Sequence, residues 1–192
     1  MHFTILSLTL AAYLLYFVYD WLNAARPGLK SGRWLFFAAT LLVAGATGLL
    51  IYRSSGFAGG LKSFVFLPLA ALSFAGMLYA VFFALPSGTY SKPDSRRRAY
   101  RGGVYALCRH PGVLTYCLFY GFLYLSMPSA GGLTECAALC AGNLLYMLFQ
   151  DFWSFPRIFS DYQDYKRETP MFFPTLNSIR RCAASYRKNR EN

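Results

Sequence analysis

Charged residues are scarce in this chain of 192 residues. They make up 14% of the sequence, whereas soluble globular proteins carry about 25%. Residues 63–91 contain no charged residue at all. This shortage excludes an ordinary soluble domain, because such a domain needs a charged surface. Hydrophobic residues supply 56% of the chain, and a bilayer core about 30 Å thick requires runs of about 20 of them. We therefore predict a membrane protein.

Several motifs of soluble enzymes are also missing from the sequence. It has no glycine-rich phosphate loop, no Ser/His/Asp set and no internal repeat. The five cysteines show no CxxC spacing, and no histidine cluster accompanies Cys136 and Cys140, which would share one helix face. We therefore expect no metal site and interpret the cysteines as small apolar packing residues.

Five apolar stretches are candidates for membrane-spanning helices, at residues 3–22, 34–52, 63–85, 111–127 and 132–149. The fourth is short for a full span. Turn residues at 128–132 separate the last two stretches, which should form an antiparallel hairpin. Small residues at Ala137, Ala141 and Gly142 would allow close helix contact there. The first stretch has no Lys or Arg before it and is longer than a signal-peptide core, so we interpret it as a retained helix.

The basic residues predict the orientation of these spans. With five spans, all but two of the 19 Lys and Arg residues lie on one side of the membrane, within residues 26–33, 92–109 and 157–190. The other side holds only Arg53 and Lys62. By the positive-inside rule the rich side is cytoplasmic, with the N-terminus outside and the C-terminus inside. We expect a multi-pass protein of a prokaryotic plasma membrane.

The net charge of +11 has two interpretations. A basic soluble protein would suggest nucleic-acid binding. Basic residues beside apolar spans instead attract anionic lipid headgroups, with about 1 kcal/mol for each Lys or Arg. We favour anionic membrane lipids as the partner and expect no nucleic acid. The basic tail at residues 177–192 should rest on these headgroups.

Polar residues reappear beside the cytoplasmic ends of the last two spans. Arg109 and His110 precede Pro111, which favours the first turn of a helix. A guanidinium and exposed backbone N–H groups at a helix N-terminus could receive a carboxylate or phosphate. The alternative is that Arg109 reaches to lipid headgroups and His110 caps the helix. Gln150 and Asp151 end the fifth span and should return to the same region, unless Asp151 is only an interfacial anchor.

A third polar element occupies residues 158–174. Tyr162 and Tyr165 share one face of a short helix, which Pro170 and Pro174 should end. The helix is amphipathic, so we expect it to lie over the membrane interface. From its periodicity alone, it could be no more than a membrane-lying anchor.

Together these elements resemble the isoprenylcysteine carboxyl methyltransferase family and the related phospholipid methyltransferases. The residues that match the first family motif, at kept spacing, are Gly103, Tyr105, Arg109, His110 and Pro111. Those that match the last motif are Tyr162, Tyr165, Pro170 and Pro174. Gln150 and Asp151 occupy the positions of a glutamate pair. The resemblance covers about 70 residues, from Gly103 to Pro174.

The resemblance implies an integral membrane methyltransferase that binds S-adenosylmethionine between its last helices and its C-terminal segment. The implied cofactor-binding residues are Gly103, Tyr105, Arg109, His110, Pro111, Gln150 and Asp151. The implied acceptor-binding residues are Tyr146, Tyr162 and Tyr165. Arg109 would hold the cofactor carboxylate, Asp151 its ammonium or ribose hydroxyls, and Tyr105 its sulfonium or adenine. Alignment of the methyl donor with the acceptor and exclusion of water would account for most of the rate acceleration, so no catalytic base is assigned.

Four positions depart from the family pattern. Val113 replaces a tyrosine, Gln150 a glutamate and Phe159 a glycine. Tyr146 stands where eukaryotic members have an arginine linked to the substrate carboxylate. The methyl acceptor therefore stays open, and a non-catalytic scaffold or lipid-binding protein with the same fold is the alternative. We divide the chain into residues 1–102 with three spans and a basic loop, 103–176 with the cofactor-binding region, and the tail 177–192.

Overall fold

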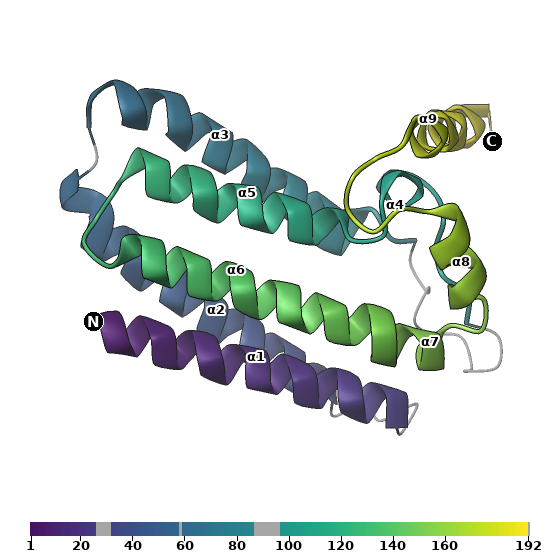
Figure 1. Ribbon diagram of the computed structural model, residues 1–192, viewed down its shortest axis with the longest axis horizontal. Helices are drawn as coiled ribbons and strands as arrows, with labels where there is room; N and C mark the ends of the chain where they lie inside the picture. Colours follow the sequence, from purple (N-terminus) through teal and green to yellow (C-terminus); the bar gives the residue numbers. More distant parts are fainter. Residues whose placement is uncertain (26–31, 58, 87–96, 192) are drawn as a thin grey trace.

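The computed structural model describes residues 1–25, 32–57, 59–86 and 97–191, and these residues form helices and connecting loops without any β-strand. Figure 1 shows the arrangement. The long helices are α1 (His2–Ala25), α2 (Gly32–Ser54), α3 (Gly60–Leu78), α5 (Pro111–Ser126), α6 (Gly132–Phe149) and α9 (Leu176–Glu191). The short elements are η1 (Ser55–Phe57), η2 (Tyr79–Phe83), α4 (Val104–Leu107), η4 (Gln150–Ser154), α7 (Phe155–Ile158) and α8 (Tyr162–Glu168).

Four helical stretches are long and apolar enough to cross a membrane: His2–Ala25, Gly32–Ser54, Gly60–Phe83 and Gly132–Ile158. The fourth predicted span forms α5, which has 16 residues. At 1.5 Å per residue it is about 24 Å long, less than the bilayer core of about 30 Å. The all-helical prediction is confirmed for the described residues, and the fifth span stays a prediction. Arg26, Lys30, Lys92 and Arg96, which supported the orientation, lie outside the described residues.

The long helices pack side by side in the order α1, α6, α5, α3, and α2 lies against α1 (Figure 1). The predicted hairpin of α5 and α6 is present, although α5 packs mainly along α3. The small residues of α6 act differently from the prediction. Gly142 faces the Tyr13 ring of α1, where a Cβ atom would collide with it, and Ala137 and Ala141 are exposed. Gly142 therefore allows close contact between α1 and α6 rather than between α5 and α6.

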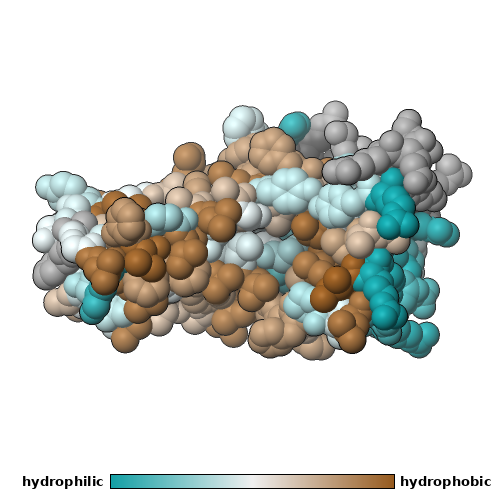
Figure 2. All heavy atoms as spheres, turned by 90° about the horizontal axis from the view of Figure 1, so that it is seen from above, coloured by the Kyte–Doolittle hydropathy of each residue, from teal (hydrophilic) through white to brown (hydrophobic). Residues whose placement is uncertain are grey.

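Polar residues gather where α4, α7, α8 and α9 meet, at the end of the bundle opposite the N-terminus (Figures 1 and 2). We call this the site end. Helix α8 ends at Glu168, and residues 169–175 are not helical, as the two prolines predicted. Tyr162 and Tyr165 are buried with Ile158 and Phe159. This face of α8 therefore packs on protein, and the predicted position of the helix over the membrane interface stays a prediction.

Candidate functional site

The Asp151 carboxylate is the centre of the site end. It lies in η4, and its side chain is 0% exposed. Its Oδ1 atom accepts hydrogen bonds from Arg109 Nε at 3.0 Å and from the Tyr162 hydroxyl at 2.7 Å. His110 Nε2 lies 3.0 Å from the same oxygen, and Lys166 Nζ lies 2.8 Å from Oδ2. We call these five residues the Asp151 cluster.

Three separate segments supply the cluster because of where their helices begin and end. His110 caps α5 at its N-terminus, with Pro111 in the first turn. Asp151 follows the end of α6, where the helix widens into a π turn. Such turns change the direction of a side chain and often occur at functional sites. Tyr162 and Lys166 are four residues apart on α8, so they share one face. The expected meeting of Arg109 and His110 with Asp151 is observed.

The Arg109 guanidinium is engaged by the protein itself. Its Nη1 donates to the backbone oxygens of Lys166 at 3.2 Å and Thr169 at 2.7 Å, and its Nη2 lies 3.4 Å from Asp151 Oδ2. The backbone N–H groups of Arg109 and His110 donate to the carbonyls of residues 170 and 171. These two N–H groups are therefore bonded to the segment after α8 rather than exposed, as buried donors require.

Burial also sets the protonation of the cluster. It lowers the pKa of His110, although the hydrogen bond to Asp151 opposes this shift. The imidazole is therefore neutral at pH 7, and its bond to a carboxylate requires the proton on Nε2. Burial raises the pKa of Tyr162, and its hydrogen bond to Asp151 raises it further. Tyr162 therefore stays a protonated donor.

Gly103, Tyr105 and Tyr165 lie beside the cluster rather than in it. Gly103 caps α4 with φ of +55° and donates its N–H to Ser185 Oγ at 2.9 Å. The Tyr105 hydroxyl donates to the Ala80 carbonyl at 2.9 Å, and its own carbonyl accepts from Tyr165 at 2.7 Å. Burial raises the pKa of Tyr105 to about 12. These bonds join η2, α4, α8 and α9, so the matched motif residues hold the elements of the site end together.

Gln150 and Asp151 do not face one pocket. Gln150 Nε2 donates to Asp20 Oδ2 of α1 at 2.8 Å, whereas Asp151 faces Arg109. Tyr146 is buried, stacks on Tyr16 at 5.2 Å between ring centroids, and also interacts with Asp20. Asp20 was not among the residues predicted for the site. The signal that could have found it is a carboxylate at the edge of an apolar helix, which needs a protein partner.

Lys166 is a second residue that sequence reasoning missed. Its position four residues after Tyr162 was the available signal. Besides Asp151 Oδ2, its ammonium lies 3.2 Å from the Asp151 carbonyl and 4.4 Å from the centroid of the Phe152 ring. Lys166 therefore ties α8 to η4 and balances the carboxylate together with Arg109.

An open groove of about 710 Å³ lies next to the cluster, between α8 and α9. Its lining residues are Lys166, Arg167, Glu168, Thr169, Pro170, Thr175, Asn177, Arg180 and Arg181. Four of these are cationic and one is acidic. Arg180 has no ion-pair partner among the described residues, and Arg181 contacts Glu168 while its buried Nε has no hydrogen-bond partner there. The groove therefore offers donors to an anion, which the Arg109 guanidinium does not.

Among the residues that the structure describes, no group of three His, Cys, Asp or Glu side chains could hold a metal ion. Comparisons with protein-family models, with curated proteins and with solved structures found no match to this chain. The interpretation of the site therefore rests on its own residues: an internally paired carboxylate, a neutral histidine and a cationic groove that share Lys166.

Proposed function

We propose that this protein is a multi-pass membrane methyltransferase. It transfers a methyl group from S-adenosylmethionine to a small or lipidic acceptor at the cytoplasmic face. Five spans cross the membrane, with the N-terminus outside. The observation that carries the proposal is the convergence of Arg109, His110 and Tyr162 on Asp151. These residues come from the three sequence elements that resemble methyltransferases, and they are up to 53 residues apart.

The groove fits the amino-acid end of this cofactor. S-adenosylmethionine carries a carboxylate, for which the exposed Arg180 and the neighbouring Arg181 supply positive charge in the groove. It also carries an ammonium, for which Glu168 is the acid of the groove. The volume of about 710 Å³ lies within the range of about 300–1,000 Å³ typical of small-molecule sites. When bound, the cofactor supplies a methyl group activated by a sulfonium.

In the proposed function, the Asp151 cluster holds the wall of this groove in place. Arg109 holds the carbonyls of Lys166 and Thr169, so it fixes the wall that α8 presents to the ligand. Neutral His110 and protonated Tyr162 keep Asp151 paired. An internally satisfied cluster of this kind is rigid, and a fixed geometry is what an in-line transfer needs. The acceptor approaches from the membrane side of the bundle.

Binding of the cofactor to purified protein in detergent tests the proposal. Isothermal titration with S-adenosylmethionine should show a single site, and S-adenosylhomocysteine should compete for it. Because two cations would be lost from the groove, the Arg180→Ala/Arg181→Ala variant should bind at least tenfold more weakly, about 1.4 kcal/mol. Arg187→Ala is the matched control, since Arg187 lies on the same helix outside the groove lining, and it should bind normally. No binding at millimolar cofactor would overturn the proposal.

A non-catalytic scaffold or lipid-binding protein with the same fold is the second candidate. Two observations favour it: every guanidinium nitrogen of Arg109 already has a partner within the protein, and Gln150 replaces one acid of the family pair. In that case the Asp151 cluster only stabilises the site end. The protein would then be stable and correctly folded but would show no cofactor binding in the titration above.

A further inference from the structure

Helix α9 differs from the long helices in direction. Figure 1 views α9 almost along its axis, whereas α1, α6, α5 and α3 run across the picture. If those helices cross a membrane, α9 lies along its surface. One side of α9 is fixed to the protein. Ser178 is buried, and Ser185, seven residues later on the same side, accepts the Gly103 N–H at 2.9 Å through its Oγ.

A second side of α9 is apolar and unpartnered among the described residues. Leu176 is 75% exposed and Ile179 is 48% exposed, and Phe173, just before the helix, is 80% exposed. Leu176, Ile179 and Ala183 are spaced by three and four residues, so they form one stripe along the helix. Large apolar side chains grouped in this way on a polar helix indicate an interaction surface rather than scattered exposure.

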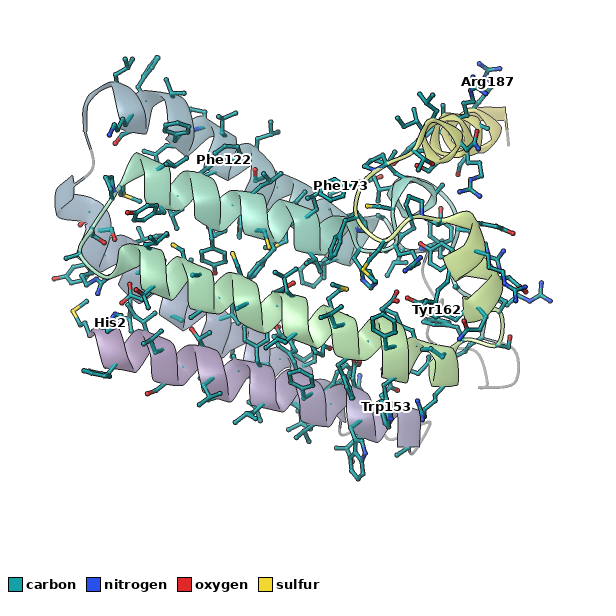
Figure 3. The ribbon with its side chains drawn as sticks, viewed as in Figure 1. His2, Phe122, Trp153, Tyr162, Phe173 and Arg187 are labelled. Carbon is teal, nitrogen blue, oxygen red and sulfur yellow. The ribbon has the colours of Figure 1, made fainter. Side chains whose placement is uncertain are left out.

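Positive charge borders this stripe. Arg180 and Arg187 are seven residues apart, which is nearly two turns, so they lie above one another beside the apolar stripe. Both are exposed, and Figure 3 shows Arg187 projecting away from the bundle. An apolar stripe next to a cationic row is the pattern of helices that lie in the interface of an anionic membrane.

The position of Phe173 agrees with this pattern. In Figure 3 it lies between α9 and the near end of α5, on the side of α9 that faces the apolar body of the bundle. Phe173 is therefore near an end of the apolar bundle. Interfacial helices bury their apolar face about 5–10 Å into the boundary between headgroups and acyl chains.

We propose that α9 and Phe173 form a membrane-surface anchor that binds an anionic leaflet. The side chains of Phe173, Leu176 and Ile179 enter the acyl boundary, and Arg187, which lies outside the groove lining, contacts lipid phosphates. This anchor is independent of methyl transfer. Because α9 also forms one wall of the groove, the anchor fixes that wall at the bilayer surface.

Spin labels in lipid nanodiscs test the anchor. In a variant without the five native cysteines, labels are introduced by Ile179→Cys and, as a matched control on the groove side of the same helix, Ala184→Cys. Both positions are exposed. In nanodiscs that contain phosphatidylglycerol, the label at 179 should be more accessible to oxygen than to a water-soluble nickel complex, and the label at 184 should show the reverse. Arg187→Gln, which leaves the groove lining intact, should reduce the difference in accessibility.

Equal accessibility at both positions would overturn the proposal, and so would dipolar broadening between labels, which would assign the stripe to a second copy of the chain. A second measurement avoids the cysteine-free background. Photocrosslinking from p-benzoylphenylalanine at position 179 of the otherwise native chain should give lipid adducts that mass spectrometry detects. The same group at position 184 should give few. Protein adducts in place of lipid adducts at 179 would also refute the anchor.

Discussion

Removal of the Asp151 carboxylate should destabilise the protein more than removal of any exposed acid. Asp151 is fully buried and pairs with Arg109, His110, Tyr162 and Lys166. In the Asp151→Ala variant the Arg109 guanidinium, which is itself 8% exposed, keeps its charge without a counter-ion. Removal of one partner from a buried ion pair costs about 3–5 kcal/mol. We expect a loss of that size in the free energy of unfolding.

Thermal unfolding in detergent, followed by circular dichroism, measures this loss. For a chain of this length, 1 kcal/mol corresponds to about 2–4 °C in Tm, so Asp151→Ala should melt roughly 6–20 °C below the wild type. Asp164→Ala is the matched control, because its pair with Arg167 on the same helix has a long contact of 3.8 Å and is largely exposed. Such a pair contributes at most about 0.5 kcal/mol. Equal melting temperatures for the two variants would refute the central place of Asp151.

Three further predictions concern other parts of the site end. Gly103→Ala should cost about 1–3 kcal/mol, since φ is +55° there, whereas Gly48→Ala, in an open helical position of α2, should leave the melting temperature nearly unchanged. Gln150→Glu should destabilise by placing two carboxylates together, and Asp20→Asn should rescue it, with a coupling energy of about 0.5–3 kcal/mol in a double-mutant cycle. Because burial lowers the pKa of His110, the unfolded state binds more protons below about pH 6.5. Stability should therefore fall from pH 7 to pH 5.5 in the wild type, and His110→Gln should flatten this decline. An unchanged slope in His110→Gln would contradict the protonation assigned to the cluster.

The helices could be predicted from the sequence because long apolar runs are a local property. The five predicted spans correspond to α1, α2, α3 with η2, α5 and α6. Helix α9 was missed as a helix, since its dense charge hid the stripe formed by Leu176 and Ile179. Its exposed apolar side becomes visible only when Ser178 and Ser185 are seen to dock the opposite side.

Part of the site could also be predicted from the sequence. Motif spacing correctly brought Arg109 and His110 to Asp151, because two antiparallel helices return the chain to one end of the bundle. It could not show that Gln150 turns to Asp20, since the direction of each side chain depends on the π turn after α6. Motif spacing also could not show that the carbonyls of Lys166 and Thr169 accept the hydrogen bonds of Arg109 Nη1. Every residue has a backbone carbonyl, so the residue types do not indicate which carbonyls act as acceptors.

Transfer of a labelled methyl group tests the proposed function most directly. The protein is reconstituted in liposomes made from total bacterial lipid and incubated with S-adenosylmethionine that carries tritium in its methyl group. The proposal predicts label in a lipid or small-molecule product, produced by the wild type and lost in the Arg180→Ala/Arg181→Ala variant. Cofactor that stays intact, with no labelled product in either the lipid or the aqueous fraction, would contradict it.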